Sequence, residues 1–128
     1  MGVDKQLHQF SLEKSEKILT RKDFINLSKI GHRVYNKYFI AVFGKGLHSR
    51  TRVGITVTKK IGCAVKRNRI KRVVREYFRL HKNGIDGTWD INIIAKKEAS
   101  TISIKQVFIS LQSVFESIAR RAQIESGH

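Results

Sequence analysis

Three segments of this chain carry apolar residues at the spacing of an amphipathic α-helix, and two of them lie toward its two ends. The first, at about residues 21–30, starts behind a weak capping box at Thr20 and ends at Gly31. We expect Gly31 to adopt the left-handed conformation that closes many helices. The second starts behind a capping box at Ser103 and keeps helical spacing over seven apolar residues to about Arg121. A stripe of this length predicts a helix packed on the core.

Three segments between these helices have the pattern of β-strands. Residues 33–43 are rich in β-branched and aromatic residues and predict a strand region long enough to bend into two strands. Residues 51–58 alternate between an apolar face and a small, polar face that carries Gly54, Thr56 and Thr58. Residues 89–95 predict a further strand. With a third helix between the last two segments, the order is α-β-β(-β)-α-β-α, which favours an α+β fold, a two-layer α/β sandwich.

That third helix, at about residues 64–80, lies in a segment that carries half of the formal charge of the chain. Residues 59–79 contain nine Lys or Arg and one Glu, a net charge of +8 out of +16. One face of the helix carries an apolar stripe at helical spacing: Ile70, Val73, Val74, Tyr77 and Phe78. The opposite face carries Asn68, Lys71, Arg72, Arg75 and Arg79. A solvated surface would explain an ordinary run of charged residues. Here the charge is concentrated in one segment and is almost entirely positive, which favours binding to a nucleic-acid backbone.

The composition narrows the class of protein further. We expect residues 1–128 to form one domain, with flexible ends at 1–9 and 122–128. No apolar run is long enough for a transmembrane helix, and no secretory signal is visible. The single cysteine, Cys63, fits a reducing cytosol. An anionic membrane is a rival partner for so basic a chain. However, a helix that lies on a membrane needs no further folded elements, whereas the rest of this chain has the pattern of a folded domain.

The sequence offers no arrangement typical of a protein nuclease. Such an enzyme needs converging carboxylates for metal ions, or a pair of histidines for acid–base chemistry. The ten acidic residues and five histidines are scattered, without zinc-ligand spacing, and no glycine-rich phosphate loop is present. Only convergence in the folded chain could bring such groups together.

The run from Arg52 to Arg79, RVGITVTKKIGCAVKRNRIKRVVREYFR, resembles the signature of the protein subunit of bacterial ribonuclease P. The family pattern is met at fourteen positions in this run: Arg52, Val53, Gly54, Lys59, Lys60, Gly62, Ala64, Val65, Arg67, Asn68, Arg69, Lys71, Arg72 and Arg75. The resemblance extends over about residues 10–121. It is far more specific than a basic helix alone.

This resemblance implies a fold like the second domain of ribosomal protein S5, with a left-handed β-α-β crossover through the basic helix. It implies that the RNA subunit, with Mg²⁺, is the catalyst, and that the protein contributes no catalytic residue. The residues expected to bind the RNA subunit are Arg67, Asn68, Arg69, Lys71, Arg72 and Arg75. Those expected to bind the 5′ leader of precursor tRNA are Phe24, Thr56, Thr58, Lys59 and Lys60. The implied setting is the bacterial cytoplasm, with neither DNA nor membrane as a partner.

Two departures from the family pattern concern the leader cleft. The family often has an aromatic residue where this chain has Ser28, and another where it has Val42. Phe24 itself could be a core residue rather than a stacking platform. The alternative function is a structural ribosomal protein or RNA chaperone without a role in cleavage, and a third is a metal-dependent nuclease that acts without RNA.

Overall fold

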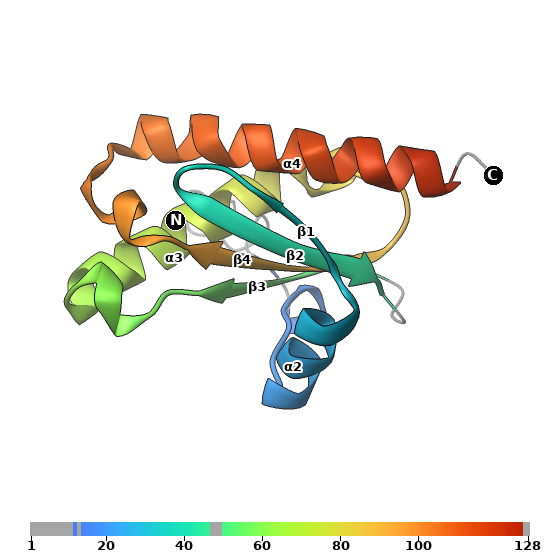
Figure 1. Ribbon diagram of the computed structural model, residues 1–128, viewed down its shortest axis with the longest axis horizontal. Coiled ribbons are helices and arrows are strands. Elements are labelled where there is room, and N and C mark those ends of the chain that lie inside the picture. The colour runs from blue at the N-terminus through green and yellow to red at the C-terminus, as the bar shows by residue number, and fades with distance from the viewer. Residues whose placement is uncertain (1–11, 13, 47–49, 127–128) are drawn as a thin grey trace, which may run out of the picture.

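The computed structural model describes residues 12, 14–46 and 50–126. The elements follow the predicted α+β order, and the strand region at 33–43 forms two strands (Figure 1). The helices and strands are α2 (Arg21–Ile30), β1 (His32–Tyr35), β2 (Phe39–Lys45), β3 (Arg52–Thr56), α3 (Ala64–His81), β4 (Trp89–Ala95) and α4 (Ile104–Ser126). Among the described residues, no helix is long and apolar enough to cross a membrane.

The four strands form one mixed sheet in the order β1-β2-β4-β3. The β1–β2 and β2–β4 pairs are antiparallel, whereas β3 and β4 are parallel neighbours. The β-α-β crossover expected between them therefore runs through α3. Asn36 holds the β1–β2 turn, because its side-chain oxygen accepts hydrogen bonds from the backbone N–H groups of Tyr38 and Phe39, both at 2.9 Å.

The sheet lies between two layers of helix. In Figure 1, α4 runs along one side of the sheet and α2 projects from the other. Phe39 and Phe43 of β2 are fully buried in the main core with α3 and α4. Val42 of the same strand points the other way and packs with Leu27 of α2 and with Ile18. Both faces of β2 are therefore buried. The predicted sandwich is confirmed in the packing of α3 and α4 on one face of the sheet, and the short helix α2 covers part of the other face.

Two details of the helix ends differ from expectation. Gly31 has φ −76° and ψ 154°, which is extended backbone rather than the left-handed cap we expected. A Cβ there would lie 2.6 Å from the carbonyl oxygen of Leu27, so close packing is what requires glycine. The last helix extends past Arg121 to Ser126, and the side chain of Ala122 is fully buried. The expectation of a flexible end from residue 122 is wrong there, and residues 1–9, 127 and 128 lie outside the described part.

Candidate RNA-binding surfaces

The basic helix is amphipathic in the way its sequence predicts. The five apolar residues of its stripe are buried in the main core: Ile70, Val73, Val74, Tyr77 and Phe78. Because α3 buries this side, the opposite side must face away from the core. We call the six predicted RNA-binding residues of this helix the α3 face. Asn68, Lys71, Arg72 and Arg75 lie on its outer side and Arg69 at the border of that side. Arg67 is in line with Val74 and Phe78 of the stripe, and its Nε atom is buried.

The α3 face is largely open to solvent. Asn68, Arg69, Arg72 and Arg75 are exposed, and Arg67 and Lys71 are partly exposed. The helix has one acidic residue, Glu76, and it forms an ion pair with Arg79, outside this set. In the described part of the chain, no ion pair neutralises the cations of the α3 face. Five positive charges on one helix, without a neutralising ion pair among the described residues, form a surface suited to phosphate groups.

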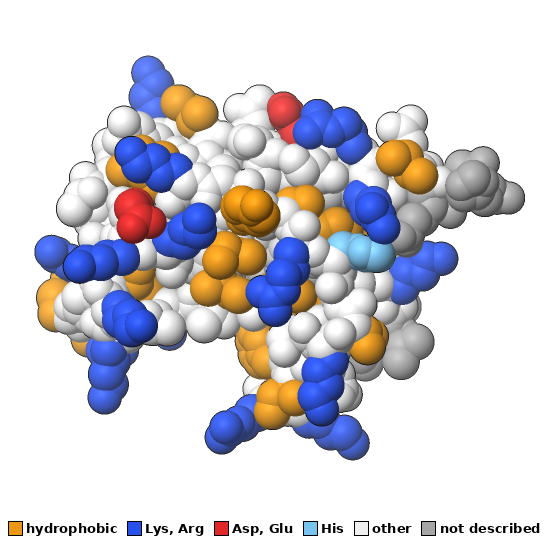
Figure 2. All heavy atoms as spheres, viewed as in Figure 1, with side chains coloured by type: hydrophobic (Ala, Val, Ile, Leu, Met, Phe, Trp, Pro, Cys, Tyr) orange, Lys and Arg blue, Asp and Glu red, His pale blue; other side chains and the backbone are white. Residues whose placement is uncertain are grey.

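The second candidate surface is the side of the sheet on which α2 packs, together with the residues that follow β3. We call it the sheet face, and its predicted RNA-binding residues are Phe24, Thr56, Thr58, Lys59 and Lys60. Figure 2 shows apolar side chains gathered over the sheet between α4 and α2, with Lys and Arg side chains around them. A hollow lies beside α2 in the same view.

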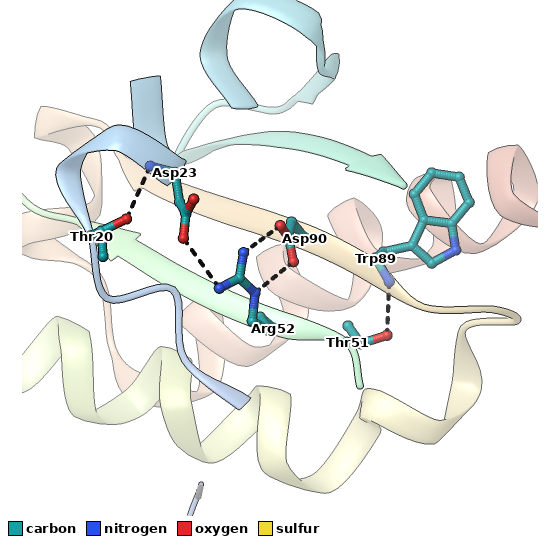
Figure 3. Close-up of polar contacts among 6 residues, drawn as sticks. All are labelled: Thr20, Asp23, Thr51, Arg52, Trp89 and Asp90. Atoms are coloured by element: carbon teal, nitrogen blue, oxygen red, sulfur yellow. Dashed lines mark hydrogen bonds and ion pairs between the residues drawn. The ribbon is translucent and has the colours of Figure 1, made fainter. Parts of the chain in front are cut away.

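A buried ion-pair network fixes the start of α2 on this side of the sheet (Figure 3). Arg52 of β3, which is 8% exposed, donates two hydrogen bonds to the carboxylate of Asp90 on β4, at 2.9 and 2.7 Å. Its third nitrogen donates to Asp23 of α2 at 3.3 Å. Hydrogen bonding to Asp90 raises the pKa of Arg52 despite its burial. Thr20 caps the same helix by accepting from the N–H of Asp23.

Phe24 lies one residue after Asp23 and packs directly on Gly54 of β3. A Cβ on Gly54 would lie 2.3 and 2.5 Å from the Cε1 and Cζ atoms of the Phe24 ring. Any larger residue at position 54 would therefore displace the ring. Phe24 is partly exposed, whereas Leu27 at i+3 is 5% exposed. Of these two residues, Leu27 is the one that faces the core, and Phe24 remains partly accessible.

The other predicted leader-binding residues line the exit from β3. The hydroxyl of Thr56 donates a hydrogen bond to the side-chain oxygen of Asn92 at 3.1 Å, so this residue is anchored to β4. Thr58, Lys59 and Lys60 follow and are all exposed. Gly62 has φ +141°, a conformation that favours glycine, and it turns the chain from these lysines into α3.

The two surfaces meet at β3, which is an edge strand of the sheet. A small pocket of about 120 Å³ at this edge is lined by Phe24 and Gly54 and also by Arg75 of α3, among others. Arg75, which we expected to contact the RNA subunit, thus borders the residue expected to contact the leader. The predicted sites are brought side by side rather than placed on opposite ends of the molecule.

Sequence reasoning assigned no role to Arg52 and named Gly54 only as part of the small, polar strand face, although both belong to the family signature. Their roles depend on partners far away in the sequence, Asp90 and Phe24. One signal was available for Arg52, since an arginine among the apolar residues of a strand must find a buried partner.

The described residues do not offer a metal site of the kind a nuclease uses. Nowhere in residues 14–46 and 50–126 do three His, Cys, Asp or Glu side chains gather closely enough to hold an ion. The two carboxylates that approach each other, those of Asp23 and Asp90, are both bound by Arg52. Within residues 14–46 and 50–126, the donor set therefore does not fit a catalytic magnesium centre.

Comparison with known proteins identifies the family. The sequence model of the Ribonuclease P family matches residues 12–119. The ribonuclease P protein component of Desulforapulum autotrophicum is 44% identical over 111 residues, covering 87% of this chain and 95% of that relative. The ribonuclease P protein of Staphylococcus aureus has a similar structure, with a TM-score of 0.78, 36% identity, and coverage of 83% of this chain and 99% of that one. The ribonuclease P protein of Thermotoga maritima gives a TM-score of 0.72 at 34% identity, covering 82% and 96% of the two chains. The chain belongs to the ribonuclease P protein family.

Proposed function

We propose that this chain, as the protein component of ribonuclease P, binds the RNA subunit of the enzyme through the α3 face. The observation that carries this proposal is the single helix that buries a complete apolar stripe and also carries five at least partly exposed cations and an exposed asparagine. Arginine and lysine contacts to phosphates fix position without reading sequence. A folded RNA with many phosphates in fixed places is a partner that such a rigid surface matches.

The sheet face then receives the 5′ leader of precursor tRNA. Phe24 is a partly exposed aromatic ring, and stacking of a base on such a ring contributes about 1–3 kcal/mol per base with little dependence on which base it is. Lys59 and Lys60, exposed after the end of β3, supply positive charge. These properties suit a single strand of variable sequence.

In this proposal the protein positions the RNAs and the RNA subunit performs the cleavage with Mg²⁺, in the bacterial cytoplasm. The scattered carboxylates support this division, because the described residues cannot assemble a metal site of their own. No catalytic step is assigned to a side chain of this protein.

Cleavage of a precursor tRNA at low Mg²⁺ tests the proposal. The reaction is run with a bacterial ribonuclease P RNA and this protein together, and with each of them alone. We expect cleavage at the mature 5′ end only when both are present. Tight RNA binding without stimulation of cleavage would favour a structural ribosomal protein or RNA chaperone. Cleavage by the protein alone would mean that its scattered acidic groups converge on an active site.

A further inference from the structure

Tyr35, at the outer edge of the sheet, is an exposed aromatic residue to which no function has been assigned. Its side chain is 74% exposed, although it occupies the last position of a regular strand. Large aromatic rings usually contribute to folding by being buried, and this one contributes little in that way. Its position relative to the sheet face suggests a different use.

The strand register places Tyr35 on the same side of the sheet as the proposed leader site. Tyr35 pairs with Ile40 of β2, Ile40 pairs with Ile94 of β4, and Ile94 pairs with Thr56 of β3. Residues directly opposite each other in neighbouring strands point to the same face. Ile40 and Ile94 pack against the same cluster as Phe24, which fixes that face as the one α2 covers.

This row of side chains crosses the whole sheet and lies next to the row that α2 covers. The neighbouring row, which contains Val42 and Gly54, is covered by Leu27 and Phe24. In the row of Tyr35, both Ile40 and Ile94 remain partly exposed. Three strand spacings of about 4.8 Å separate the backbones of Tyr35 and Thr56 by roughly 14 Å. An apolar floor therefore extends from Thr56 to an aromatic ring at the far edge.

The charges around Tyr35 favour an anionic strand as the occupant of this floor. The ammonium group of Lys96 lies 5.5 Å from the centre of the Tyr35 ring and donates a hydrogen bond to the carbonyl oxygen of Asn36 at 2.8 Å. This hydrogen bond fixes the cation beside the ring. Arg33, two residues before Tyr35 on the same strand face, is exposed. An aromatic platform with fixed cations beside it is the arrangement that single-stranded nucleic acids bind.

We propose that Tyr35 and Lys96 form a second base-stacking subsite, which extends the leader-binding surface across the sheet from Phe24. The subsite takes a nucleotide of single-stranded RNA, with its base on the Tyr35 ring and its phosphate near Lys96. It rests on the proposed function of the sheet face.

The affinity of the reconstituted enzyme for precursor tRNA tests the subsite. Tyr35→Ala, Tyr35→Phe and the control Ile109→Ala, an exposed residue of α4, are compared using tRNAs with leaders of increasing length. We expect Tyr35→Ala to weaken binding about tenfold once the leader is long enough to reach β1, while mature tRNA is bound unchanged. Tyr35→Phe should keep the wild-type affinity, and so should Ile109→Ala.

A fluorescent base gives a second readout that a purely structural role would not change. With 2-aminopurine placed at successive leader positions, stacking on Tyr35 should quench one position in the wild-type enzyme and in Tyr35→Phe, but not in Tyr35→Ala. Equal affinity and equal quenching in all variants would overturn the subsite and leave the exposed ring to a protein partner. A wild-type enzyme that binds precursor and mature tRNA equally would instead refute leader binding itself, which is a separate failure.

Discussion

The α3 face and the sheet face are both basic, but they are built in opposite ways. The α3 face comes from one continuous segment, and every residue in it is placed by the period of a single helix. The sheet face is assembled from α2, β3 and the ends of other strands, and Phe24 reaches its position only through Gly54 and Arg52. Single substitutions on the α3 face should therefore leave the fold intact, whereas removing a support of the sheet face should destabilise the protein.

The comparison also suggests how the two surfaces divide their tasks. Six polar side chains on one rigid helix can match phosphates that an RNA fold holds in fixed positions. A partly exposed aromatic ring on an apolar floor can accept successive bases of a flexible strand. Because Arg75 borders the pocket of Phe24, the RNA subunit and the leader would lie next to each other across β3.

The largest effect should come from removing the support of the sheet face. Arg52→Ala leaves the carboxylates of Asp23 and Asp90 without their shared partner, so the free energy of unfolding should fall by about 3 kcal/mol. Urea denaturation measures this loss. Arg72→Ala, at an exposed arginine of α3, is the matched control and should change it by less than about 0.5 kcal/mol. Similar losses in both variants would remove the distinction between the two surfaces.

The next effect tests the α3 face by RNA affinity rather than by stability. Arg69→Ala and Arg72→Ala should each weaken binding to the RNA subunit by about 2 kcal/mol and reduce the salt dependence of binding, because each removes a phosphate contact. The measurement is a titration of the RNA subunit at several salt concentrations. The far-ultraviolet circular dichroism should be unchanged, since both residues are exposed. Affinities equal to wild type in both variants would contradict the assignment.

A smaller effect should follow when Phe24 is displaced without being removed. In Gly54→Ala the new Cβ meets the ring at 2.3 Å, and we expect the preference for precursor over mature tRNA to fall by about 1.5 kcal/mol. Phe24→Ala should reduce the same preference. Gly84→Ala is the control, because no atom lies within 4 Å of the added carbon. If Gly54→Ala kept the full preference, the position of the ring would not matter for the leader.

The smallest effect concerns the start of α3. Backbone N–H groups at the start of α3, chiefly that of Lys66, favour the thiolate of Cys63 and lower the pKa of this exposed thiol. A lowered pKa means that the reactive thiolate is present at lower pH in the folded protein than in the unfolded chain. Alkylation by iodoacetamide should therefore show its half-maximal rate at a lower pH in buffer than in urea. Identical pH profiles in buffer and in urea would mean that the start of α3 does not lower the pKa of the Cys63 thiol.

The same contrast explains what the sequence alone could predict. The bounds of α2 and α3 and the burial of the α3 stripe follow from local periodicity and capping, and these predictions are confirmed. The contact of Phe24 with Gly54 joins α2 to β3, so no local pattern contains it. The sequence predicted that residues 33–43 could bend into two strands, but not where. Asn36 makes the turn without the help of glycine or proline. The end of α4 was missed because Ala122, four residues after Ile118, is too small to signal burial.

The division of the two surfaces between two RNAs can be tested directly with one cysteine at a time. The native chain has a single cysteine, Cys63, at the start of α3. A hydroxyl-radical-generating iron chelate is attached there, or at Ser28→Cys on α2 in a Cys63→Ser background. In the assembled enzyme with precursor tRNA, we predict strand scission in the RNA subunit from position 63 and in the 5′ leader from position 28. Scission of the RNA subunit alone from both positions, with an intact leader, would contradict the proposal.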